Sequence, residues 1–174
     1  MKYPSLSHKA KGIKGQRMFQ ILKQAKALEK TGVNVLHFEL GDPDLDTPRV
    51  VVEAAIAALK GGKTHYEPSA GIERLRTNSA EVTLRSRGFR PNLEQILVTP
   101  GANYQIFLSL ACVANPGDEI IVPDPGFVSY YSLCSYMGLK IVSCPIEESN
   151  SFECLSNDIE KRITSKTKAI IINN

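Results

Sequence analysis

Short apolar runs alternate with longer helical patterns over residues 95–173, and this alternation constrains the fold more than any other feature of the sequence. The runs are rich in Ile and Val, which favour strands, and turn-forming residues separate many of them from the neighbouring helical patterns. We expect strands at 96–99, 119–122, 139–143 and 168–172, and helices at 103–114, 127–137 and 156–163. Strands that alternate with helices form βαβ units. The sequence therefore predicts an α/β fold, in which a mostly parallel sheet carries helices on both faces.

The first half of the chain has helical periodicity and contains one short extended run, at residues 33–41. We expect helices in this half at 18–28, 48–60 and 72–87. Thr47 is placed to cap the second of these helices, and Pro48 suits its first turn. Gly88 is placed to end the third.

The length of 174 residues suits one domain, or one domain with an added arm. Residues 1–28 hold seven Lys or Arg and no acidic residue, so they form a basic arm. This arm lacks the interleaved aromatics and the motifs of nucleic-acid binding, which favours a solvated or partner-contacting arm. The alternative is a transit peptide, although the basic residues are mostly Lys. No apolar run approaches the roughly 18 residues of a membrane span, and the start has no secretory signal. These features predict a cytoplasmic protein that binds neither nucleic acid nor membranes.

The four cysteines are spread over the second half of the chain, at positions 112, 134, 144 and 154. They form no CxxC pair, and the three histidines lie far apart in sequence, so the spacing of metal ligands is absent. We therefore expect no metal site. Reduced and mostly buried thiols are the expectation for such a chain.

The stretch "ILVTPGANYQ" (96–105) joins the first expected strand directly to a helix. A helix start offers unpaired N–H groups and a partial positive charge, and ligands bind at the carboxyl ends of parallel strands. Gly101 lets a ligand approach the backbone, Ala102 is too small to block it, and Asn103 adds a side-chain amide. The pattern is typical of a phosphate site, although a plain strand–helix turn would also use the glycine. It is neither a P-loop nor a GxGxxG loop.

A second candidate residue is Phe127, in "VPDPGFVSYY" (122–131), which opens the helix after the next expected strand. Loops that follow neighbouring parallel strands lie side by side. Phe127 could therefore stack on a flat ring whose phosphate is held at 101–103. The alternative is that Phe127 belongs to the hydrophobic core.

Four stretches, taken in order, resemble the class I/II aminotransferases that depend on pyridoxal 5'-phosphate (PLP), the fold type I group that includes aspartate and tyrosine aminotransferases. They are "ELGDPDLDTP", "HYEPSAGIERLR", "ILVTPGANYQIFLSLACVANPGDEIIVPDPGFVSYY" and "SKTKAIIINN". The resemblance runs from about Phe38 to Asn174.

The resemblance implies a role for each matching residue. Gly101–Asn103 would hold the cofactor phosphate and Phe127 would stack on the pyridine ring, where relatives often have Trp or Tyr. Tyr66 would reach the phosphate of a neighbouring subunit, which implies a homodimer. Gly41 would bring its backbone close to the substrate carboxylate.

The resemblance also implies a division of the chain and a reaction. Residues 1–47 would form an arm and part of a small domain, and residues 48–174 the first half of the PLP-binding large domain. The reaction would move an amino group between an amino acid and a 2-keto acid. The family places its Schiff-base lysine beyond the matched stretches. We therefore expect no catalytic residue in this chain and no activity from it alone.

The sequence leaves three alternatives to this function open. The first is another fold type I PLP enzyme, such as a C–S lyase or a synthase. The second is a non-catalytic fragment that binds or dimerises. The third is an unrelated doubly wound nucleotide binder. The third suits the sequence only weakly, because the loop has a single glycine, Gly101, and Pro123-Asp124 follow the next strand.

Overall fold

The computed structural model describes residues 4–13 and 16–173. The chain divides into two compact units, Met1–Leu40 with Asn103–Asn174, and Gly41–Ala102, and each is described by itself. The predicted domain ranges, 1–47 and 48–174, also include residues 1–3, 14–15 and 174, which lie outside the described residues.

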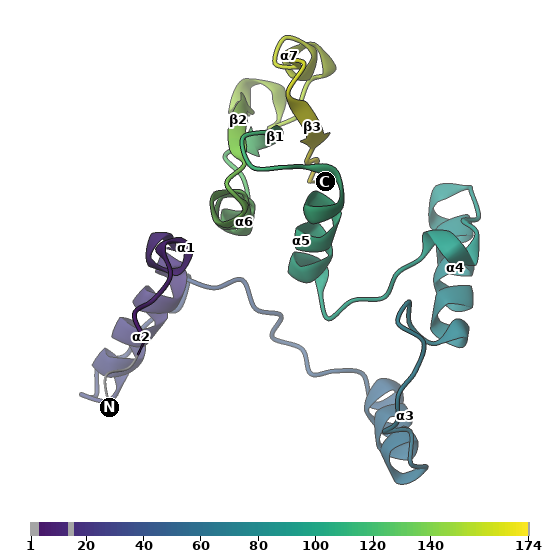
Figure 1. The fold of residues 1–174 in the computed structure, drawn as a ribbon. Coiled ribbons are helices and arrows are strands. Elements are labelled where there is room, and N and C mark those ends of the chain that lie inside the picture. The colour runs from purple at the N-terminus through teal and green to yellow at the C-terminus, as the bar shows by residue number, and fades with distance from the viewer. Residues whose placement is uncertain (1–3, 14–15, 174) are drawn as a thin grey trace. The chain divides into compact units, whose positions relative to one another are not determined.

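The first unit contains a three-stranded parallel sheet (Figure 1). Its strands are β1 (Glu119–Asp124), β2 (Lys140–Pro145) and β3 (Thr167–Ile170), in the order β2-β1-β3. Ile120 is paired with Ile141 on one side and with Ala169 on the other. Helix α6 (Val128–Met137) connects β1 to β2, and the short helix α7 (Ser156–Glu160) precedes β3. Helices and a parallel sheet confirm the predicted α/β class.

The core of this unit forms around the central strand. Ile120, Ile121 and Val122 are almost completely buried, as a strand covered on both faces requires. Helix α5 (Ala102–Val113), α6 and the residue before β2 supply further buried side chains. The buried cluster consists of Leu110, Ile120, Val122, Tyr130, Cys134 and Leu139. The apolar run predicted as a strand is therefore the center of the fold.

The predicted strand at 96–99 is wrong. Residues 96–99 belong to no sheet, and no strand among residues 4–13 and 16–173 pairs with them. A strand needs a neighbour to bond its N–H and C=O groups along its length. Here the Val98 N–H donates one isolated hydrogen bond, to the Ala70 carbonyl at 3.0 Å. An apolar, β-branched run shows that a segment can be buried, but it does not supply that neighbour.

Gly71 lets two segments of the second unit approach closely. Its φ is +101°, and a Cβ at this position would lie 2.6 Å from the Val98 Cγ2. Both the backbone conformation and the space therefore require glycine. The tight loop leads into α4 (Glu73–Arg87), which ends at Gly88 with a φ of 78°, as predicted. A 3₁₀ helix, η1 (Leu93–Gln95), follows.

Helix α3 (Arg49–Lys60) differs from the prediction at its start. Pro48 occupies the N-cap position and no side chain caps the helix, so the predicted capping role of Thr47 is wrong. Proline fixes its own φ and has no N–H to satisfy, which makes it compatible with this position. The end of the helix at Gly61 agrees with the prediction.

The basic arm forms two helices that belong to the first unit, α1 (His8–Gly12) and α2 (Arg17–Glu29). Between them the Gln16 Nε2 donates to the Ser129 Oγ at the start of α6, at 3.1 Å. The Lys9 Nζ lies 5.5 Å from the center of the Tyr136 ring, near the end of α6. Helix α1 and Gln16 therefore pack along α6. No described helix is both long and apolar enough to cross a bilayer.

The four cysteines are all free, but only Cys134 and Cys144 are buried. Cys154 is half-buried and Cys112 is exposed. The expectation of mostly buried thiols therefore holds for two of the four. Burial raises the pKa of the Cys134 thiol and is the largest cause of the raised pKa of Cys144.

His37 follows α2 and lies between two carboxylates. Its Nδ1 is 2.6 Å from the Glu39 Oε1, and its Nε2 is 3.0 Å from the Glu29 Oε1. The hydrogen bond with Glu39 is the largest cause that raises the pKa of His37 above 6.5, and the hydrogen bond with Glu29 is the second largest. Protonated His37 therefore stabilises the fold below pH 6.5, and this contribution is lost as the pH rises through the raised pKa.

We expect Glu39→Gln to lower the pKa of His37 more than Glu29→Gln does, because Glu39 contributes the larger shift. An NMR titration of the His37 ring protons measures both values. Equal pKa values for His37 in the wild type and in the Glu39→Gln variant would contradict this arrangement.

Candidate functional site

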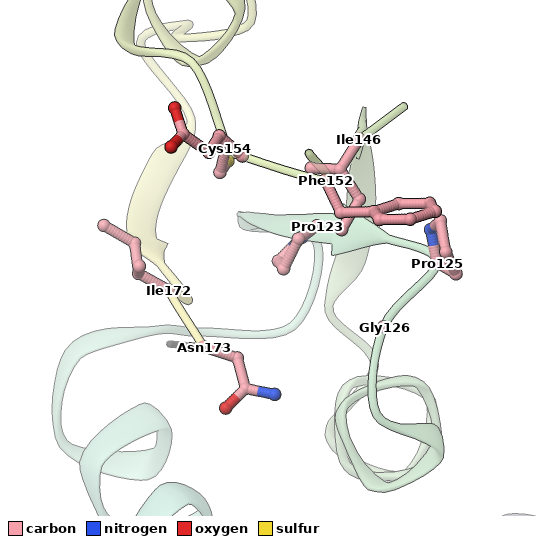
Figure 2. A pocket seen from close by; sticks show the side chains of 9 residues that line it. Pro123, Pro125, Gly126, Ile146, Phe152, Cys154, Ile172 and Asn173 are labelled. Atoms are coloured by element: carbon pink, nitrogen blue, oxygen red, sulfur yellow. The ribbon is translucent and has the colours of Figure 1, made fainter. Parts of the chain in front are cut away.

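The carboxyl ends of β1, β2 and β3 meet at one edge of the sheet, and a cavity of about 510 Å³ opens there (Figure 2). In parallel sheets this edge is where ligands bind. Residues that follow each strand line the cavity together with the loop before α7. The principal ones are Pro123, Gly126, Ile146, Phe152, Glu153 and Ile172.

The walls of this cavity are polar and apolar in about equal parts, and Glu153 brings a carboxylate. Of the described residues that line it, none is Lys or Arg. An anion therefore finds no Lys or Arg counter-charge in the cavity itself.

Backbone geometry at the ends of β1 and β2 shapes the cavity. A Cβ on Gly126 would overlap the Pro123 carbonyl oxygen, so the turn after β1 accepts only glycine there without a shift. The Ser143 hydroxyl donates to the Asp124 Oδ2 at 2.9 Å and fixes that carboxylate across the two strands. Phe152 has a φ of 58°, which is uncommon for a residue with a side chain.

Helix α5 begins at Ala102, directly after Gly101. Gly101 has a φ of +90°, and no heavy atom lies within 4 Å of where its Cβ would be. The positive φ, and not a lack of space for a side chain, therefore favours glycine at this position. The Gly101 N–H donates to the Thr99 carbonyl at 2.8 Å and closes a tight turn. Ala102 and Asn103 are exposed. Because the first four N–H groups of a helix have no intrahelical partner, this end can bind an anion.

Phe127 occupies the N-cap position of α6, directly after the turn that follows β1. Its side chain is 43% exposed and contacts Tyr130 edge-on, with ring centers 5.7 Å apart. An exposed part of the ring is therefore free to contact a ligand.

Gly41 and Tyr66 belong to the unit Gly41–Ala102. Gly41 is exposed, with open space around it, and the Tyr66 side chain is fully exposed. Their roles at a cofactor or substrate stay predictions, and so do those of Gly101–Asn103 and Phe127.

Sequence reasoning missed the cavity residues Phe152 and Glu153. They lie in "EESNSFE" (147–153), which reads as a polar loop. One available signal was the aromatic residue inside an otherwise polar stretch that follows a strand, since loops at this edge carry function.

Comparison with known proteins gives the family. The family described as aminotransferase class I and II matches residues 33–174. The chain is 36% identical over 168 residues to a probable aspartate/prephenate aminotransferase of Aquifex aeolicus, covering 97% of this chain and 43% of the relative. It is 34% identical to an arginine–pyruvate transaminase of Pseudomonas aeruginosa, covering 99% of this chain and 44% of that protein.

A solved structure, aspartate aminotransferase from Thermus thermophilus with maleate, matches with a TM-score of 0.91 and 33% identity. The match covers 98% of this chain and 44% of that structure. The chain thus spans less than half the length of these relatives. With a family match over most of its residues, the chain belongs to the class I and II aminotransferases.

Proposed function

We propose that this chain works as part of a PLP-dependent aminotransferase, which moves an amino group between an amino acid and a 2-keto acid. Two relatives are named for such reactions, an aspartate/prephenate aminotransferase and an arginine–pyruvate transaminase. When bound, PLP supplies the electron sink for this chemistry. The observation that carries the proposal is the exposed start of α5 after Gly101, which fits a phosphate group.

The residues of this chain would bind and orient the cofactor. The N–H groups of Ala102 and Asn103 would donate to the phosphate, and Gly101 would hold the turn that exposes them. The exposed part of the Phe127 ring would stack on the pyridine ring. Tyr66 would donate its hydroxyl to the phosphate in a partner subunit, and the Gly41 backbone would lie beside the substrate carboxylate.

The wider assignments belong to the same proposal. Residues 1–47 would serve as the arm and part of the small domain, and residues 48–174 as the first half of the large domain. We propose a homodimer in the cytoplasm that takes part in amino acid metabolism. Its partners are the amino acid and 2-keto acid substrates, without nucleic acid or membrane.

We expect Ala102→Asp to weaken the binding of both PLP and inorganic phosphate about tenfold or more. A carboxylate at this position repels the phosphate and competes for its donors, and one lost hydrogen bond to a charged group costs about 1.5–3 kcal/mol. The helix itself should persist, because an acidic residue in the first turn is favourable. Equilibrium dialysis against each ligand measures the affinities. Val50→Asp, at the exposed start of α3, is the matched control and should bind as the wild type does.

The Phe127→Ala variant tests the contact with the pyridine ring separately from the contact with the phosphate. It should weaken PLP binding about fivefold, for a stacking contribution of about 1 kcal/mol, and leave inorganic phosphate unchanged. Wild-type affinity for both ligands in the Ala102→Asp variant would overturn the site. Equal losses of PLP and phosphate in the Phe127→Ala variant would overturn the stacking role.

The exposed apolar face of α3 supports association with a second copy. Val52, Ile56 and Leu59 lie at helical spacing, and each is more than 40% exposed. We expect multi-angle light scattering to show a species larger than a monomer, since large exposed apolar patches favour association. Ile56→Glu should shift the population toward monomer, and Glu53→Gln, on the same helix, should not. A monomer over a wide concentration range in the wild type would contradict this expectation.

A further inference from the structure

Two free thiols lie in contact at the carboxyl edge of the sheet. Cys144, near the end of β2, is completely buried, and Cys154, on the loop that leads to α7, is half-buried. Their sulfur atoms are 3.7 Å apart. Cys154 also lines the cavity described above (Figure 2). The other two cysteines differ, since no sulfur contact joins Cys112 or Cys134 to another thiol among the described residues.

The contact is close to what a disulfide needs. A sulfur–sulfur bond is about 2.05 Å long, so closing it takes a side-chain movement of less than about 2 Å from the present separation. The segment between the two cysteines contains the 3₁₀ helix η2 (Glu148–Asn150) and lies at the cavity. No strand of the sheet has to separate for the two sulfurs to meet, because Cys154 lies outside the strands.

The surroundings distinguish the two thiols. Burial raises the pKa of Cys144, and contact with Cys154 raises it further, whereas Arg162 acts in the opposite direction. The Arg162 Nε donates to the Ser143 carbonyl at 2.8 Å, which fixes the guanidinium beside β2. Cys144 is therefore protected as a thiol, and Cys154 is the one that a small oxidant can reach from the cavity.

We propose that Cys154 and Cys144 form a peroxide-responsive thiol pair, in which Cys154 is oxidised first and Cys144 then closes a disulfide. The thiolate sulfur of Cys154 attacks one oxygen of hydrogen peroxide. The S–O bond forms, the O–O bond breaks and hydroxide leaves, so that sulfur loses two electrons and peroxide is reduced. Cys144 gives its proton to that hydroxide. Its sulfur then attacks the Cys154 sulfur, the S–S bond forms and the S–O bond breaks. The hydroxide that leaves takes up the proton that Cys154 released when it became a thiolate, and so forms the second water. Two thiols and one peroxide give one disulfide and two waters.

The test uses the purified, reduced chain and hydrogen peroxide as the probe. After brief treatment, remaining thiols are alkylated under denaturing conditions, and disulfide-linked peptides are mapped by mass spectrometry. We expect two of the four cysteines to lose reactivity together and the linked peptides to contain Cys144 and Cys154. Cys112→Ser, which removes the exposed thiol, is the matched control and should give the same linked pair.

Two variants test the order of events. Cys144→Ala should leave Cys154 as a sulfenic acid that dimedone traps, and Cys154→Ser should leave Cys144 fully alkylatable after peroxide. Because Cys144 is buried and its replacement can disturb folding, the wild-type peptide map decides the proposal by itself. A different linked pair, unchanged reactivity of all thiols, or over-oxidised Cys154 beside an alkylatable Cys144 would each overturn it.

Discussion

Incubated with PLP, an amino acid and a 2-keto acid, the purified chain should yield no transaminated product above the enzyme-free rate. The reaction requires a lysine amine beside the reactive carbon of the cofactor, to bind it covalently and to carry the proton. No lysine lies between Lys63 and Lys140 in the sequence. Lys140 begins β2, and Lys168 lies in the first half of β3, both toward the edge opposite the cavity.

Borohydride reduction followed by mass spectrometry checks this expectation directly. A stoichiometric pyridoxyl-lysine, together with keto acid formed from an amino acid, would contradict it. The matched positive control joins residue 174 to the remaining C-terminal segment of the Aquifex aeolicus relative, which restores the length of the family. That chimera should transaminate, and its Ala102→Asp variant should require a higher PLP concentration. Release of ammonia or of a thiol in place of amino-group transfer would favour the lyase alternative.

Ile120→Ala should destabilise the first unit by about 2–5 kcal/mol, the cost of truncating a fully buried large aliphatic residue. Ile120 is completely buried in the central strand and belongs to the cluster that joins β1 to α5 and α6. Such a loss is a large part of the stability of a typical domain. Urea unfolding followed by circular dichroism measures the change.

Ile172→Ala is the matched control, because this isoleucine follows β3 and is 61% exposed. Its effect should stay within about 0.5 kcal/mol, as for most surface substitutions. Equal effects of the two substitutions would show that β1 is not the center of the folded core.

The three strands of the sheet and the helices α5, α6 and α7 could be predicted, because burial and helix ends leave local marks in the sequence. Helix α1 was not predicted. The run at 120–122 is apolar since both faces of β1 are covered, and Gly88 and Gly138 mark helix ends where φ is positive. The error at 96–99 has a non-local cause. Hydrophobicity predicts that a segment is extended and buried, but not which strand will pair with it.

Of the candidate site, only the helix start can be compared with its prediction. A helix start after a glycine can be recognised from the sequence, and α5 begins where it was expected, within one residue of Asn103. The cavity was not predictable, because it depends on how the loop that carries Phe152 and Glu153 folds over the strand ends. The contact between Cys144 and Cys154 was missed for the same reason, since ten positions separate them and no sequence spacing signals it.

The order β2-β1-β3 leaves β1 as the strand with two neighbours, while the outer edges of β2 and β3 are unpaired among the described residues. An unpaired edge presents a row of N–H and C=O groups that another extended chain can bond. During refolding, the sheet of one molecule therefore competes with strand addition by another, and the second process grows with protein concentration. A low protein concentration during refolding should then raise the yield of folded chain.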